Sequence, residues 1–177
     1  GERAGLEEAA YRFGLIVTGK GEREFLPDLF RSLQASASCE FRVLNKVRQR
    51  SAITSPKKKL KMLGRGKTIP DRDAEEIGLP ARGFLQAYQR SFVLLIDDLE
   101  HDRRPQRREV FDRYRTALDT MLKPMCLEKR AAVHFLVNML EPYYFADAKA
   151  VNAVLGTSLE DHQGDVEEDI RHPKNRL

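Results

Sequence analysis

Residues 15–26 read LIVTGKGEREFL, an apolar run that stops at a Gly-Lys-Gly turn and is followed at once by acidic residues. The run begins at Phe13. Its branched apolar residues follow one another without alternating with polar residues, which is typical of a strand covered on both faces. Two further runs of this kind are FVLLI at 92–96 and AAVHFLV at 131–137. FRVLNKV at 41–47 alternates more, which predicts a fourth strand nearer an edge.

Helical patterns lie between these runs. Residues 108–123 repeat apolar side chains at helical spacing, and residues 143–156 predict a short helix that ends at Gly156. Residues 21–34 place a stripe of apolar side chains on one predicted helix face: Phe25, Leu26, Leu29, Phe30 and Leu33. Strands that alternate with helices predict an α/β fold, a mostly parallel sheet flanked by helices with right-handed crossovers.

The length of 177 residues predicts a single domain over residues 1–177. Gly, Pro and basic residues concentrate between 48 and 80, which predicts a basic insertion or loop within that domain. The two cysteines, Cys39 and Cys126, fit no zinc spacing and no disulfide framework, and this favours a reducing compartment. We find no apolar run of membrane-spanning length and no signal peptide pattern at the start, so we expect a cytoplasmic protein.

The charge of the chain is uneven. Its net charge is +4, yet no Asp or Glu occurs between Phe41 and Lys67. A local positive field of this kind favours polyanions such as nucleic acid, although a run of like charges is also typical of a solvated loop. The candidate nucleic-acid-binding residues are Arg48, Arg50, Lys57, Lys58, Lys59, Lys61, Arg65 and Lys67.

The Gly-Lys-Gly turn at 19–21 could place backbone N–H groups at a helix N-terminus, where anions bind. It lacks the spacing of a P-loop and of a dinucleotide fingerprint, and Glu22 and Glu24 would repel a phosphate. A nucleotide-binding regulatory domain is therefore disfavoured. The simpler alternative is a glycine turn with acids in the first helical turn, where they are favourable.

Carboxylates follow the predicted strands. Asp97 and Asp98 come directly after the run 92–96, and Glu141 comes shortly after the run 131–137. Because ligands of open parallel sheets gather beyond the carboxyl ends of the strands, we expect Glu22 to meet these acids there. Such a cluster suits Mg²⁺ or Mn²⁺, with Glu22, Asp97, Asp98 and Glu141 as metal ligands and Glu22 and Asp97 as catalytic residues. The alternative for a strand-terminal Asp is a helix N-cap.

The segments VTGKGE (17–22), LLIDDLE (94–100) and VNMLEPYYFAD (137–147) together resemble the TOPRIM fold of topoisomerases, primases and OLD-family nucleases. They are more similar to a prokaryotic family of small TOPRIM-like proteins catalogued as a domain of unknown function, whose members read roughly V-E-G-x-T-E near the start. The matching residues are Gly19, Glu22, Asp97, Glu141, Phe145 and Asp147.

The resemblance implies a Mg²⁺-dependent nuclease or phosphoryl-transfer protein that acts on nucleic acid in a phage-defence or mobile-element context, with an ATPase as a partner. Thr18 departs from the pattern, because it stands where the first glutamate of V-E-G is expected. The alternative is therefore a catalytically degenerate TOPRIM-like module that binds nucleic acid or a partner protein.

Overall fold

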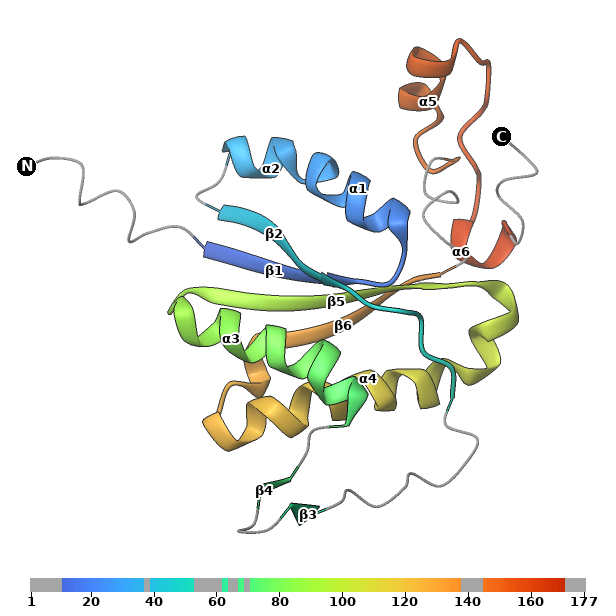
Figure 1. Cartoon of the computed structure of the whole chain (residues 1–177). Helices are drawn as coiled ribbons and strands as arrows, with labels where there is room; N and C mark the ends of the chain where they lie inside the picture. The colour runs from blue at the N-terminus through green and yellow to red at the C-terminus, as the bar shows by residue number, and fades with distance from the viewer. Residues whose placement is uncertain are drawn as a thin grey trace, which may run out of the picture. The chain divides into compact units, whose positions relative to one another are not determined.

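A computed structural model of the chain describes residues 11–36, 39–52, 62–63, 67–68, 71–137 and 145–170. Its main sheet has four parallel strands in the order β2-β1-β5-β6 (Figure 1). The strands are β1 (Tyr11–Val17), β2 (Cys39–Lys46), β5 (Ser91–Leu99) and β6 (Ala131–Val137). All four predicted strands are therefore confirmed, and the α/β fold is consistent with a Rossmann-like or TOPRIM-like arrangement.

The remaining elements are mostly helices. They are α1 (Lys20–Leu29), α2 (Arg31–Ser36), α3 (Leu79–Ala87), α4 (Arg107–Leu122), α5 (Ala148–Leu155) and α6 (Val166–Asp169). A turn of π-helix at Ala74–Gly78 runs directly into α3, and short 3-10 turns lie at His101–Gln106, Lys123–Met125 and Glu128–Arg130. Two short strands, β3 (Met62–Leu63) and β4 (Lys67–Thr68), pair antiparallel with each other. None of the described helices is long and apolar enough to cross a membrane.

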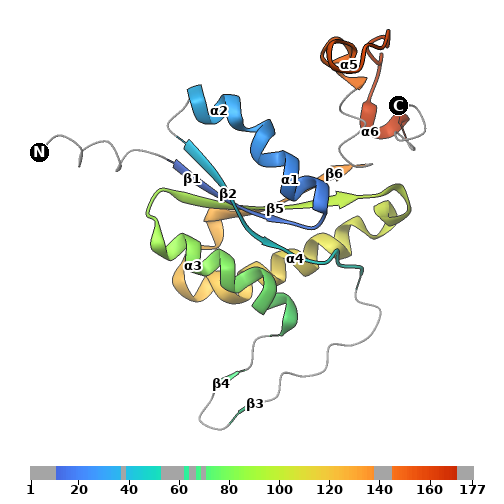
Figure 2. The same cartoon turned by 45° about the horizontal axis from the view of Figure 1, so that its top comes forward.

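The chain divides into two compact units. The first comprises residues 1–97 and 108–134, and within it α1 and α2 cover one face of the sheet while α3 and α4 cover the other (Figures 1 and 2). The second comprises residues 98–107 and 135–177. In the second unit the Asp147 side chain caps α5, which begins at Ala148. Gly156 ends this helix with a φ of 67°, as the sequence predicts.

The core of the first unit is built on β1, an inner strand. Its residues Leu15, Ile16 and Val17 are completely buried, because helices lie over both faces of the strand. At Gly14 a Cβ atom would come within 2.9 Å of the Phe84 ring and 2.5 Å of a Leu44 methyl group, so glycine permits α3 to approach the sheet closely.

Three details differ from the expectations. Phe25, Leu29 and Leu33 are exposed and Leu26 alone of the predicted stripe is buried. Only one side of α1 faces the sheet, and Leu33 lies in the separate helix α2, so the predicted single stripe is divided between two helices. Among the described strands β6 lies at the end of the order, and Ala132 and His134 are exposed, so it is not covered on both faces as the sequence predicts. Residues 74–80, expected in an insertion or loop, are helical.

Candidate functional site

The turn from β1 into α1 is formed by Gly19, the N-cap of the helix. Glu22 follows in the first helical turn, and its carboxylate folds back over Gly19. A Cβ atom at Gly19 would lie 1.8 Å from Glu22 Oε2, so only glycine accommodates the carboxylate in this position. Glu22 is 6% exposed, and its Oε2 is a buried oxygen with no hydrogen-bond partner in the described part of the chain. The predicted position of Glu22, at the carboxyl end of the sheet in a first helical turn, is observed.

Asp97 lies at the matching level of β5. The last paired residues of β1 and β5 are Val17 and Ile96, so Thr18 and Asp97 follow side by side. Thr18 Oγ1 donates a hydrogen bond to Asp97 Oδ1 at 2.7 Å, and the Tyr114 hydroxyl donates to Asp97 Oδ2 at 2.9 Å. Asp97 has no exposed surface. Both oxygens of this carboxylate therefore accept hydroxyl hydrogen bonds inside the core.

Asp98 does not share the environment of Asp97. Side chains alternate between the two faces of a strand, so consecutive carboxylates of β5 point in opposite directions. The Asp98 carbonyl oxygen accepts a hydrogen bond from Arg103 Nη1 at 2.9 Å within the second unit. Adjacent residues of one strand are poorly placed to bind a single cation, and the grouping of Asp97 with Asp98 as joint ligands is not supported by this geometry.

The expected four-carboxylate metal site is not assembled in the described ranges. Glu141 lies outside them, and among the described residues no group of three or more His, Cys, Asp or Glu side chains is placed to hold a metal ion. The chemistry of the donors is mixed. The buried oxygen of Glu22 suits a cation, whereas each Asp97 oxygen already accepts one hydroxyl hydrogen bond, and the neighbouring Thr18 supplies a hydroxyl instead of a second carboxylate. Among the described residues, Asp97 and its hydrogen-bond partners therefore do not by themselves supply the three carboxylates that the predicted Mg²⁺ site needs.

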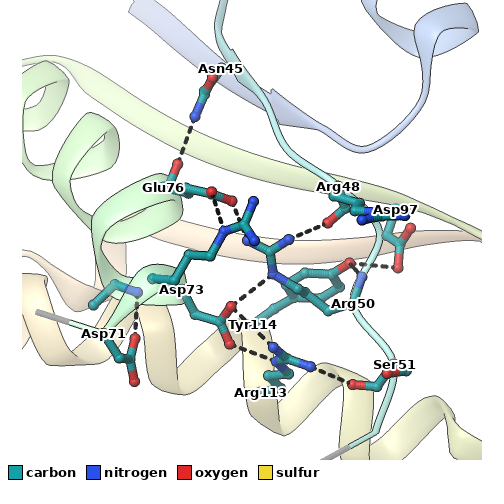
Figure 3. A network of polar contacts seen from close by, with 12 residues as sticks. Asn45, Arg48, Arg50, Ser51, Asp71, Asp73, Glu76, Asp97, Arg113 and Tyr114 are labelled. Atoms are coloured by element: carbon teal, nitrogen blue, oxygen red, sulfur yellow. Dashed lines mark hydrogen bonds and ion pairs between the residues drawn. The ribbon is translucent and has the colours of Figure 1, made fainter. Parts of the chain in front are cut away.

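A buried ion cluster adjoins Asp97 (Figure 3). Arg50 Nε donates to Asp73 Oδ1 at 2.8 Å, and another guanidinium nitrogen of Arg50 pairs with Glu76. Arg113 Nε donates to Asp73 Oδ2 at 2.6 Å. The cluster is joined to Asp97 through Tyr114, because the Arg50 backbone N–H donates to the Tyr114 hydroxyl at 3.0 Å.

The charges of this cluster change the titration of its acids. Burial by itself raises the pKa of Asp73, but the hydrogen bonds and charges of Arg113 and Arg50 outweigh it and hold that pKa below its usual range. Hydrogen bonds from Arg72 and Arg50 likewise lower the pKa of Glu76. Both acids are therefore held in the charged form that the arginines require.

Arg50 is consequently not a surface contact for nucleic acid. We expected it to bind phosphate, but its side chain is 6% exposed and is engaged with Asp73 and Glu76. A guanidinium buried between two carboxylates is already neutralised, so this part of the prediction is corrected. The partners Asp73, Glu76 and Arg113 were not identified from the sequence. The helical spacing of 108–123 signalled the burial of Tyr114 but nothing about its hydroxyl contacts.

The other basic residues predicted to bind nucleic acid fall into two groups, those whose side chains the structure describes and those whose side chains it does not. Arg48 is exposed, as are Arg42 and Lys46 on β2, which is an outermost strand of the main sheet. We call these three residues the basic edge. The other predicted contacts lie outside the described residues or in β4, of which the structure describes only the backbone: Lys57, Lys58, Lys59, Lys61, Arg65 and Lys67.

Comparison of the whole chain with models of protein families, with curated proteins and with solved structures finds no match.

Proposed function

We propose that this chain is a TOPRIM-like module that binds nucleic acid through its basic edge and does not cleave it. The observation that supports binding is the row of exposed cations Arg42, Lys46 and Arg48, on and just beyond β2. No acidic residue occurs between Phe41 and Lys67, so the positive charge of the edge continues along the chain. Phosphate contacts from arginine and lysine provide most of the affinity of sequence-independent binding.

The absence of cleavage is supported by Asp97. A nuclease of the TOPRIM type would use this carboxylate together with a second acid to hold a cation, and here the residue beside it is Thr18, which donates a hydroxyl hydrogen bond to it instead. A phosphate bound at the basic edge would then meet no activated water. Binding by a partner ATPase, which the family resemblance implies, stays a prediction.

Glu22 favours a second candidate, metal-dependent phosphoryl transfer. Its buried oxygen without a partner stands at the carboxyl end of the sheet, where ligands of parallel sheets bind. A buried carboxylate oxygen normally has a partner, and a divalent cation is one that would suit it. One experiment can distinguish the two candidates.

The test measures binding of labelled single- and double-stranded DNA and RNA by fluorescence anisotropy, between about 50 and 200 mM salt. The variant Arg42→Gln/Lys46→Gln/Arg48→Gln removes the basic edge. A matched control, Arg90→Gln/Arg108→Gln/Lys129→Gln, removes three exposed cations elsewhere in the first unit. If each residue of the basic edge contacts one phosphate, the slope of log K against log salt decreases by about 0.9 per residue, and the control keeps the wild-type slope.

Two results would contradict the proposal. The first is equal loss of binding in the basic-edge variant and in the control, which would show that only net charge matters. The second is cleavage of any of these substrates with Mg²⁺ or Mn²⁺ at a rate that Glu22→Gln abolishes. That result would establish the second candidate instead.

A further inference from the structure

The hydrogen-bond directions around Asp97 follow from the donors present. The Arg50 backbone N–H can only donate, so the Tyr114 hydroxyl accepts from it and directs its own single hydrogen to Asp97 Oδ2. The Thr18 hydroxyl directs its hydrogen to Asp97 Oδ1. An ionised carboxylate is an acceptor at both oxygens, and this arrangement provides each oxygen with a donor.

The Asp97 carboxylate would be destabilised if residue 18 were an acid. A second carboxylate has no hydrogen to donate, and two anions within hydrogen-bonding distance repel each other unless a cation lies between them. Thr18 is 7% exposed and Asp97 is fully buried, so bulk water would screen that repulsion little. A hydroxyl at residue 18 removes the repulsion and supplies a donor in one step.

We infer that Asp97 is an anchor that needs no cation. The Thr18 hydroxyl stabilises its carboxylate by a hydrogen bond, as a metal ion would stabilise it if residue 18 were a second acid. Through this anchor, β5 is bonded to the residue that follows β1, to α4 and, by way of Tyr114, to the segment that carries Arg50. The inference concerns how β5 is held to the turn after β1 and to α4. It does not depend on whether the basic edge binds nucleic acid.

The test is thermal unfolding of the whole chain in EDTA and in a series of Mg²⁺ or Mn²⁺ concentrations. Four variants accompany the wild type. Thr18→Ser keeps the hydroxyl, Thr18→Val removes it without adding charge, Thr18→Asp adds the second carboxylate, and Asp97→Asn removes the anion. The double variant Thr18→Asp/Asp97→Asn separates the pair of acids from either acid alone.

In the wild type and in Thr18→Ser, any change in Tm between EDTA and Mg²⁺ should be no larger than the change in Asp97→Asn. Thr18→Val should lose stability equally in both. Thr18→Asp should be the least stable in EDTA, and a saturating cation should raise its Tm by about 5–10 °C if the ion is present at a hundred times its Kd. That increase should be absent in the double variant. If Thr18→Asp does not fold in EDTA, recovery of its circular dichroism on addition of Mg²⁺ replaces the Tm as the measurement.

The inference is overturned if Mg²⁺ or Mn²⁺ raises the wild-type Tm in a saturable way and Asp97→Asn abolishes the increase. It is also overturned if Thr18→Asp gains nothing from either cation. An increase that is equal in the wild type and in Asp97→Asn supports the inference, because it places any bound cation away from Asp97.

Discussion

Arg50 and Asp73 form a buried ion pair in which each side chain is less than a tenth exposed, although the residues are 23 positions apart. Asp73 also accepts two hydrogen bonds from Arg113, at 2.6 and 3.2 Å, and Arg113 Nη1 donates to the Ser51 carbonyl at 2.9 Å. The two arginines thus share one acid. The chain that leaves β2 and the chain that enters α3 are held together at this point.

Substitution of Asp73 should therefore lower the free energy of unfolding substantially. Asp73→Asn leaves the buried Arg50 with Glu76 as its remaining charged partner among these contacts and removes the acid that Arg113 contacts. Loss of one partner of a buried ion pair destabilises a protein by about 3–5 kcal/mol. Urea unfolding should show this loss as a lower midpoint concentration. Thermal unfolding should show it as a reduction in Tm of roughly 2–4 °C for each kcal/mol.

The matched control is Asp28→Asn, the same chemical change in the exposed ion pair between Asp28 and Arg31. Exposed pairs contribute little, so its effect should be below about 1 kcal/mol. Equal effects of the two substitutions would show that the Arg50 cluster is not buried as described.

The ion cluster also predicts how stability depends on pH. The pKa of Asp73 is lower in the folded protein than its usual value of about 3.9. A lowered folded-state pKa contributes stability that is fully present above the unfolded-state pKa and is lost as the pH decreases through the folded-state pKa. The free energy of unfolding should thus decrease below about pH 4. Urea titrations at a series of pH values should give a shallower decrease for Asp73→Asn than for the wild type, and parallel curves would contradict the assignment.

Gly19 and Glu22 should be energetically coupled. Gly19 has an extended backbone (φ −104°), so alanine is conformationally allowed there, but its Cβ would occupy the place of the Glu22 carboxylate. Because that carboxylate is at the end of a flexible side chain, Gly19→Ala should displace it at a cost of about 0.5–1 kcal/mol. In a Glu22→Ala background the cost should vanish. A double-mutant cycle of unfolding free energies measures this coupling, and strict additivity of the two changes would refute it.

The two sides of α1 should differ in their response to substitution. Leu26 is 2% exposed, and Leu26→Ala should destabilise the protein by about 2–5 kcal/mol through the cavity it leaves. Leu29 is 63% exposed, and Leu29→Ala should change the free energy of unfolding by less than about 0.5 kcal/mol. Comparable losses for both leucines, measured by urea unfolding, would indicate that Leu29 is covered in the protein in solution.

The sequence by itself determined the strands, most of the helices and the parallel α/β class. These depend on runs and periodicities within ten to twenty residues, which the chain carries locally. It also predicted Glu22 in the first turn of a helix after β1, which the structure confirms. It ended the third strand before Asp97, whereas β5 continues to Leu99, because charged residues within a strand interrupt the apolar run by which a sequence reveals it. The helical segment at 74–80 was missed, since its Gly, Pro and charged residues are typical of loops.

Only the tertiary structure decided what these residues contact. Arg50 belongs to a run of cations in the sequence, yet its side chain is buried. Asp73 and Glu76, more than twenty positions further along the chain, contact it from the start of the helical segment that leads into α3 (Figure 3). Asp97 can be a metal ligand by its position, yet Thr18 and Tyr114 provide both of its oxygens with donors. Which charges face water and which face each other depends on pairs that are distant in the chain, and no local pattern encodes such a pair.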